Sequence, residues 1–295
     1  MALTLDEILS CHRTGRAVVM GTLNVTPDSF SDGGKFFDAA SAVAQAQRMV
    51  AEGADIIDVG AESTRPGSQR VGAAEQIRRI EPVLPEVARM GAVVSIDTTL
   101  SEVARFAIQA GAKIVNDVSA GRDDPEMFAL AAAREVGLVL MHMLGEPKTM
   151  QQEPRYDDVV AEVRDFLAGR LAAAEAGGVD RRRCIVDAGI GFGKRLEDNL
   201  ALLRHVEALA ELGVPVLCGP SRKRFIGEIA GEPVPANRLG GTIAACLAAR
   251  RHGAHLFRVH DVAAVVQALA VAEAIEPASP AQRRRPEGPP AGAPR

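Results

Sequence analysis

Cationic side chains recur in the polar segments that end the short apolar runs of this chain. Arg65, Lys223, Arg258 and His260 all stand in such segments. Guanidinium, ammonium and imidazole groups bind phosphate and carboxylate groups. The segment PSRKRFIG, residues 220–227, also begins a predicted helix, whose free backbone N–H groups favour anions. These residues predict the binding of a phosphorylated or carboxylated ligand.

Oxygen-bearing side chains form a second set at the ends of apolar runs. Asp97, Asn116 and Asp187 each end a run rich in valine and isoleucine. Fixed carboxylates and amides suit a flat heterocycle whose ring has neighbouring N–H and C=O edges. The same three side chains could instead hold a divalent cation. The residues alone leave both interpretations open.

Alternating apolar runs and Ala-rich helical segments must position these side chains. The short runs contain mainly valine and isoleucine, and the longer segments between them have helical period. Several of the helical segments end in a glycine, as a helix C-cap favours. The predicted strands are residues 17–23, 55–60, 92–97, 113–118, 137–143, 184–189, 214–219 and 255–260.

This alternation predicts an α/β fold with a parallel sheet covered by helices. Eight such units in about 250 residues match a (β/α)8 TIM barrel, in which chemistry occurs at the carboxyl ends of the strands. We therefore predict one domain, residues 1–276, with an open doubly wound sheet as the alternative fold. Residues 277–295 are rich in proline and arginine, and we expect them to form a disordered tail.

The overall composition is that of an ordinary soluble protein. The chain has 47% hydrophobic and 24% charged residues and a formal net charge of -4, which disfavours nucleic-acid and membrane-surface partners. Its 4 cysteines are far apart and none forms a CxxC pair, so we expect free thiols. No apolar run reaches the roughly 18 residues of a membrane span. We expect a cytoplasmic protein.

An ordered series of motifs resembles one enzyme family, the dihydropteroate synthases. The motifs, between residues 20 and 262, are NVTPDSFSDGG, GAESTRPG, SIDT, NDVS, MHM with a following TMQ, GIGFGK, SRK and RVHDV. The resemblance implies a (β/α)8 barrel, usually homodimeric and a target of sulfonamides. It also implies a transferase of folate biosynthesis that joins 6-hydroxymethyl-7,8-dihydropterin pyrophosphate to p-aminobenzoate, releasing pyrophosphate and 7,8-dihydropteroate.

The resemblance also implies roles for individual residues. The residues implied for the pterin are Asp97, Asn116, Met141, Asp187, Phe192 and Lys223. Those implied for the diphosphate are Asn24, acting through Mg²⁺, together with Arg65, Arg258 and His260. These roles favour the heterocycle over a cation at the three oxygen-bearing side chains.

Two loops would close over the bound substrate. Dissociation of pyrophosphate before attack by the arylamine would leave a cation on the pterin, which must be shielded from water. The implied catalytic residues are Asp32, which faces this cation and the magnesium, with Phe30, Thr64, Arg65 and Lys223. The implied p-aminobenzoate residues are Phe30, Pro66, Ser221 and Arg224.

Arg224 departs from the commonest family pattern, because many members have serine at this position. Its guanidinium could bind the aminobenzoate carboxylate, or it could point to solvent and leave the backbone N–H groups to bind.

Two other functions fit parts of the pattern. A methyltetrahydrofolate:corrinoid methyltransferase would keep the barrel and the pterin-binding side chains, but it has no use for a diphosphate site. A catalytically silent pterin-binding barrel would first lose the residues that act only in the transition state. The residues that act on the diphosphate and the cation are all present, which favours the synthase: Asn24, Asp32, Arg65, Lys223, Arg258 and His260.

Overall fold

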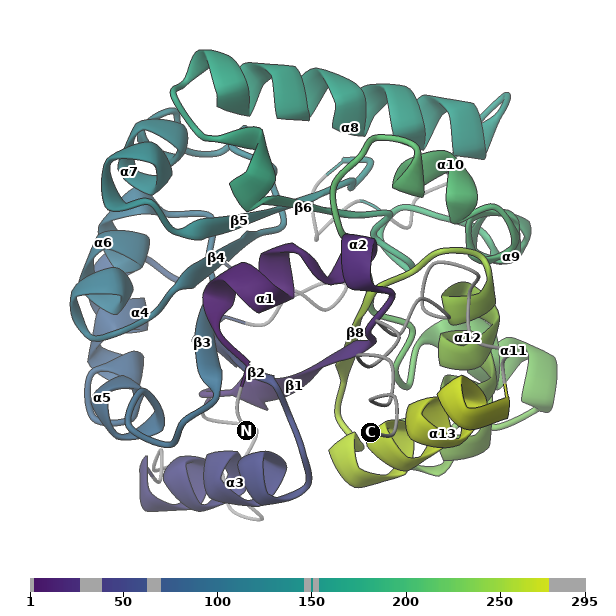
Figure 1. Cartoon of the computed structure of the whole chain (residues 1–295), viewed down its shortest axis with the longest axis horizontal. Coiled ribbons are helices and arrows are strands. Elements are labelled where there is room, and N and C mark those ends of the chain that lie inside the picture. The colour runs from purple at the N-terminus through teal and green to yellow at the C-terminus, as the bar shows by residue number, and fades with distance from the viewer. Residues whose placement is uncertain (1–2, 27–38, 63–69, 146–149, 151–153, 276–295) are drawn as a thin grey trace, which may run out of the picture.

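Eight parallel strands form a closed barrel. The computed structural model of the chain describes residues 3–26, 39–62, 70–145, 150 and 154–275. The strands pair in chain order from β1 to β8, and β8 pairs with β1, so the open sheet is excluded and the predicted barrel is confirmed (Figure 1). The strands are β1 (Val18–Asn24), β2 (Ile56–Gly60), β3 (Val93–Asp97), β4 (Ile114–Asp117), β5 (Gly137–Met141), β6 (Cys184–Asp187), β7 (Val216–Cys218) and β8 (Leu256–Val259).

Helices surround the barrel, as the alternating pattern predicts (Figure 1). They are α3 (Ala39–Ala51), α4 (Ala73–Ile80), α5 (Leu84–Val87), α6 (Ser101–Gln109), α7 (Glu126–Arg134), α8 (Val159–Ala176), α9 (Leu196–Arg204), α10 (Glu207–Ala210), α11 (Arg224–Ala230), α12 (Leu239–Arg251) and α13 (Val262–Ile275). Short 3₁₀ helices occupy Arg181–Arg183 and Pro235–Asn237. Within the described residues, no helix combines the length and the apolar character that a bilayer span needs.

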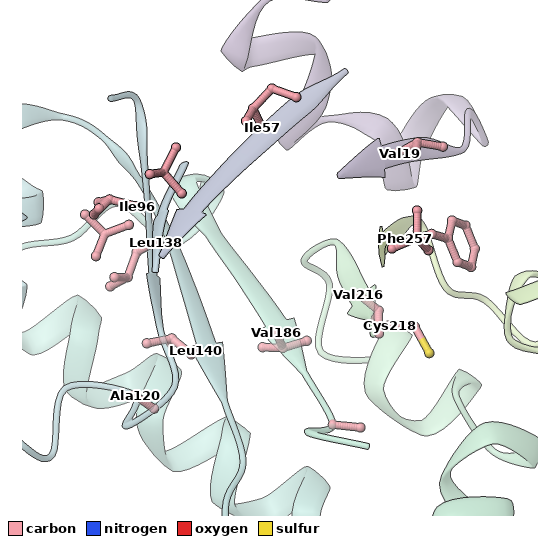
Figure 2. Packing of buried hydrophobic residues seen from close by; sticks show 14 of the residues in the cluster. Val19, Ile57, Ile96, Ala120, Leu138, Leu140, Val186, Val216, Cys218 and Phe257 are labelled. Atoms are coloured by element: carbon pink, nitrogen blue, oxygen red, sulfur yellow. The ribbon is translucent and has the colours of Figure 1, made fainter. Parts of the chain in front are cut away.

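Apolar side chains fill the space between the strands and the outer helices. Val19, Ile57 and Phe257 belong to this layer, which is drawn in part in Figure 2. The 4 cysteines are buried free thiols, as the sequence predicts. Because side chains alternate along a strand, the neighbours of these residues face the barrel interior.

The barrel interior changes from apolar to polar along its axis. At the amino ends of the strands, Val18, Met20 and Ile56 pack against Ile8 and Leu9. These last residues belong to α1 (Leu5–Leu9), which with α2 (Cys11–Thr14) lies across this end of the barrel (Figure 1). Toward the carboxyl ends of the strands, the side chains that point into the barrel are polar. The fold therefore closes one end with apolar contacts and leaves the other for chemistry.

The two loops predicted to close over the substrate are described only in part. Phe30, Asp32, Thr64, Arg65 and Pro66 lie outside the described residues. The tail expected to be disordered, residues 277–295, also lies outside them.

Candidate active site

A cavity lies at the carboxyl ends of the strands. Its lining residues, which define the central cavity, are Asp97, Asn116, Val118, Met141, Asp187, Ile190, Phe192, Gly219, Lys223 and Arg258. Every residue that the sequence predicts for the heterocycle is among them. Arg258, predicted for the diphosphate, lines the same cavity.

The amide of Asn116 is held in one orientation by a residue that the sequence analysis missed. Its Nδ2 donates to Oδ2 of Asp58 at 3.0 Å, so the assigned orientation leaves its carbonyl oxygen as the acceptor for a ligand. Asp58 is fully buried. The only signal for it in the sequence is an acidic residue inside the apolar run DIIDVG, residues 55–60.

Arg258 joins Asp58 to Asp97 across the barrel interior. Its Nε donates to Asp58 Oδ2 at 2.6 Å, and its Nη2 donates to Asp97 Oδ2 at 2.9 Å. Burial raises the pKa of Asp97, and the guanidinium opposes that shift. Buried acids paired with a cation are acceptors of fixed direction, and they suit the amino and N–H groups of a ring.

Asp187 supplies a second carboxylate to the central cavity. Its Oδ1 accepts the backbone N–H of Gly189 at 2.7 Å, which fixes the plane of the carboxylate. Burial raises its pKa, while this N–H and Lys223 act in the opposite direction. The cationic Lys223 and Arg258 in the same wall disfavour a divalent cation there. The geometry favours the heterocycle.

The ammonium group of Lys223 lies over the ring of Phe192 at one side of the central cavity. Its Nζ lies 4.0 Å from the centroid of the Phe192 ring, which is a cation–π distance. Burial lowers the pKa of Lys223 to about 8, so it is mainly protonated at neutral pH. The backbone of Lys223 is fixed from outside, because Arg238 donates to the carbonyl oxygens of Arg222 and Lys223 at 3.0 and 3.3 Å.

The loop after β6 carries Phe192 and packs tightly against the loop after β5. A side chain at Gly193 would place its Cβ 2.6 Å from the carbonyl oxygen of Leu144. Nζ of the buried Lys194 lies 3.0 Å from Nδ1 of His142 and also donates to the carbonyl oxygen of Phe192 at 3.0 Å. Burial lowers the pKa of His142 to about 3, so its neutral ring accepts this bond. Lys194 therefore ties the two loops together below the Phe192 ring.

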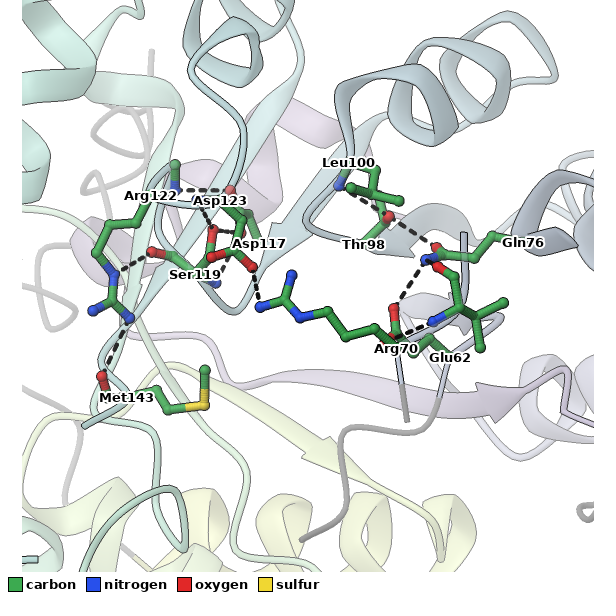
Figure 3. Close-up of polar contacts among 12 residues, drawn as sticks. Glu62, Arg70, Gln76, Thr98, Leu100, Asp117, Ser119, Arg122, Asp123 and Met143 are labelled. Carbon is green, nitrogen blue, oxygen red and sulfur yellow. Dashed lines mark hydrogen bonds and ion pairs between the residues drawn. The ribbon is translucent and has the colours of Figure 1, made fainter. Parts of the chain in front are cut away.

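Polar contacts also hold both flanks of residues 63–69 (Figure 3). Glu62 accepts from Nε2 of Gln76 at 2.9 Å and from the backbone N–H of Val71 at 3.2 Å. Arg70 forms an ion pair with Asp123 at 2.7 Å. These contacts fix the points where the loop that carries Thr64 and Arg65 leaves and rejoins the barrel.

His260 and Ser221 lie together at the ends of β8 and β7. Ser221 Oγ accepts the backbone N–H of His260 at 3.2 Å, and it lies 3.0 Å from Nδ1 of the ring. If the hydroxyl donates to Nδ1, the proton of the neutral ring is on Nε2, which can donate to a ligand. Burial lowers the pKa of His260 to about 4. The ring is therefore neutral at neutral pH in this arrangement, and its predicted role at the diphosphate stays a prediction.

Arg224 does not line the central cavity. Its side chain is 81% exposed and forms an ion pair with Glu228 at 2.7 Å, one turn further along α11. The prediction that its guanidinium binds a ligand carboxylate is not supported by this position, because the helix turns the side chain outward. The alternative, in which it points to solvent, agrees with the structure.

Asn24 ends β1 opposite Gly60, at the same level as Asp97. A Cβ placed on Gly60 would lie 3.8 Å from Asn24 Oδ1 and 3.5 Å from Asp97 Cβ. Asn24 therefore lies beside the acidic edge of the central cavity. Within the described ranges, no three histidine, cysteine or acidic side chains are grouped to hold a metal ion.

Comparisons with known proteins agree with this geometry. The family model described as "Pterin binding enzyme" matches residues 20–260. The dihydropteroate synthase of Synechocystis sp. is 46% identical over 261 residues, covering 88% of this chain and 90% of that protein. The dihydropteroate synthase of Neisseria meningitidis serogroup B is 47% identical over 262 residues, covering 87% and 92%.

Solved structures give the same result. The Xanthomonas albilineans dihydropteroate synthase with 4-aminobenzoic acid has a TM-score of 0.84 and 49% identity, covering 92% of this chain and 94% of that one. The same enzyme in complex with 7,8-dihydropteroate has a TM-score of 0.80 and 47% identity, covering 92% and 95%. With its barrel, its central cavity and these relatives, the chain belongs to the family of pterin-binding enzymes.

Proposed function

We propose that this chain catalyses the dihydropteroate synthase reaction. It joins 6-hydroxymethyl-7,8-dihydropterin pyrophosphate to p-aminobenzoate, releasing pyrophosphate and 7,8-dihydropteroate for folate biosynthesis. The observation that carries the proposal is the central cavity, in which Asp97, Asn116 and Asp187 face the cations Lys223 and Arg258. Relatives with this activity in their names match most of the chain.

The pterin ring lies in the central cavity. Its lining of acidic, amide and cationic side chains suits a small, flat heterocycle. Asp187 accepts hydrogen bonds from the amino and N–H edge of the ring, and the carbonyl oxygen of Asn116 accepts another. The ammonium of Lys223 donates to the opposite edge, while Met141 and Phe192 contact the ring faces.

The diphosphate and its magnesium bind at the mouth of the cavity. Nε2–H of His260 donates to the diphosphate, and an anion there raises the pKa of this ring from about 4. Asn24 offers a neutral oxygen of the kind that Mg²⁺ binds, and Mg²⁺ commonly takes its other ligands from water and substrate phosphates. When bound, the ion neutralises the leaving diphosphate. The family resemblance assigns Arg65 and Asp32 to the diphosphate and magnesium as well; both lie outside the described residues.

The reaction replaces one bond at the methylene carbon of the pterin by another. The bond from this carbon to the diphosphate oxygen breaks, and the electron pair leaves with the diphosphate. The amino nitrogen of p-aminobenzoate then bonds to the carbon and loses a proton. The family resemblance assigns the stabilisation of the cation between these two steps to the carboxylate of Asp32.

We also propose a homodimer in the cytosol. Two exposed apolar side chains lie at and just beyond the end of α11, namely Ile229 and Val234. Two more, Val271 and Ile275, are exposed on α13. Such surfaces are often covered in oligomers. Four buried free thiols suit a reducing compartment. Light scattering coupled to size-exclusion chromatography tests the dimer, and a mass of one chain at micromolar concentration argues against it.

Turnover by the purified chain tests the function. Pyrophosphate release is measured with dihydropterin pyrophosphate and Mg²⁺, with and without p-aminobenzoate, and the product is identified by mass. We expect release coupled to 7,8-dihydropteroate, and we expect Asp187→Asn to lose most of it. Pterin binding without any release would favour the silent barrel, and no binding would contradict the proposed function.

A further inference from the structure

A layer of polar side chains lies directly beneath the central cavity. Thr22, Asp58 and Ser95 are at one level of neighbouring strands, because Thr22 pairs with Asp58 and Asp58 pairs with Ser95. All three are buried, with exposed fractions of 3%, 0% and 0%. Residues paired in this way project to the same face of a sheet. That face is the barrel interior, since Met20 and Ile56, two positions earlier on β1 and β2, lie there.

Each of these three side chains has an oxygen without a partner. Oγ1 of Thr22, Oδ1 of Asp58 and Oγ of Ser95 make no hydrogen bond to any described residue. Unpaired buried oxygens are rare in folded proteins, because each loses its bonds to water. The three lie on adjacent strands, about 5 Å apart from strand to strand, and face the same barrel interior. Such a place suits one water molecule, which needs two to four polar partners.

The other oxygen of Asp58 already organises the cavity above. Oδ2 accepts from Arg258 Nε at 2.6 Å and from Asn116 Nδ2 at 3.0 Å. Arg258 in turn donates to Asp97 at 2.9 Å. One carboxylate therefore sets the direction of two cavity residues directly and of a third through Arg258. A partner at Oδ1 adds a second fixed point to this carboxylate.

We propose that a buried water molecule binds Thr22 Oγ1, Asp58 Oδ1 and Ser95 Oγ, and that Asp58, fixed in this way, is a positioning residue for pterin binding. The water donates to Asp58 Oδ1 and accepts from the two hydroxyl groups. A metal cation is disfavoured at this point, because Arg258 already supplies the positive charge that faces Asp58. The role in pterin binding rests on the proposed function, whereas the water site does not.

Asp58→Asn tests the positioning role with little change of shape. An amide at this position either turns its NH₂ toward the donors of Arg258 and Asn116 or loses the charge that holds the guanidinium. The readouts are the dissociation constant of fluorescent 6-hydroxymethylpterin and the melting temperature. We expect the dissociation constant to rise about tenfold or more, as the loss of one charged hydrogen bond predicts.

Asp55→Asn is the matched control, because it alters another acid next to the same strand. Asp55 Oδ2 accepts the backbone N–H of Val19 at 2.9 Å, near the opposite end of the barrel. We expect it to lower the melting temperature and to leave pterin affinity within about twofold. Equal losses of affinity in the two variants, or wild-type affinity in Asp58→Asn, would overturn the positioning role.

Two further measurements keep the proposal testable if Asp58→Asn does not fold. Ser95→Ala removes one ligand of the water, and we expect it to weaken pterin binding about threefold or more; unchanged affinity counts against the proposal. A high-resolution crystal structure of the wild-type chain should show a water within about 3.2 Å of all three oxygens. An empty site there would overturn the proposal that a water molecule binds these oxygens. If the wild type itself fails to bind the pterin, the proposed function fails, while the crystal structure still decides the water site.

Discussion

Replacing Lys194 with methionine should change how folding stability depends on pH. Lys194 is 3% exposed, and its Nζ lies among atoms of His142 and Phe192. Burial lowers its pKa from 10.5 to about 7. In the unfolded chain the same amine keeps its proton up to about pH 10. Between pH 7 and 10 the unfolded state therefore binds more protons at this residue than the folded state.

The sign and the size of the effect follow from this difference. Below pH 7 both states are protonated, and the full cost of burying the ammonium is present. As pH rises above 7 the folded state releases the proton, so Lys194 makes stability increase by up to about 1.4 kcal/mol per pH unit. This gain ends near pH 10, where the unfolded state releases its proton too. Methionine has no such proton, so the variant lacks this part of the slope.

Urea unfolding at a series of pH values from 6.5 to about 9.5 measures the effect. Other groups, including Lys223 and the cysteines, also titrate, but they are present in both proteins, so the difference between the two curves reports mainly on Lys194. Lys113→Met, which removes an exposed lysine at the start of β4, should run parallel to the wild type. Parallel curves for wild type and Lys194→Met would refute the buried and desolvated state of this amine.

Three further substitutions test other parts of the site. Gly189→Ala should lower the free energy of unfolding by about 2 kcal/mol or more, since φ is +65° and a Cβ would overlap the carbonyl oxygen of His142; unchanged stability in urea unfolding would contradict this. Lys223→Met should weaken 6-hydroxymethylpterin binding about tenfold or more in a fluorescence titration, because it removes a buried ammonium from the cavity, and wild-type affinity would exclude Lys223 from the site. Arg224→Ala should leave the KM for p-aminobenzoate within about twofold, since its exposed side chain, among the described residues, pairs with Glu228 on its own helix; a tenfold rise would return Arg224 to the binding site.

The residues at the strand ends were predictable because strand period and barrel geometry determine where they project. Asp97, Asn116 and Asp187 follow separate apolar runs, and parallel strands bring those ends to one rim. The barrel topology alone therefore predicts that these three side chains lie in one cavity. Met141, at the end of β5, lines the same cavity, but only the family resemblance implied it.

Other features depend on contacts that no local pattern contains. Asp58 is separated from Arg258 by 200 residues, and its role exists only where β2 and β8 face the same interior. The neutral state of His260 follows from burial, which the motif does not report. The outward direction of Arg224 depends on where α11 begins, which sequence patterns leave uncertain by a few residues.

The central claim is that the cavity between Asp97, Asn116 and Asp187 holds the pterin ring. A crystal structure of this chain with 6-hydroxymethyl-7,8-dihydropterin pyrophosphate tests it most directly. We predict the amino edge of the ring on Asp187 and Asn116, with Nζ of Lys223 within hydrogen-bond distance of the ring. A ring bound elsewhere, or one with its amino edge turned away from these side chains, would contradict the account.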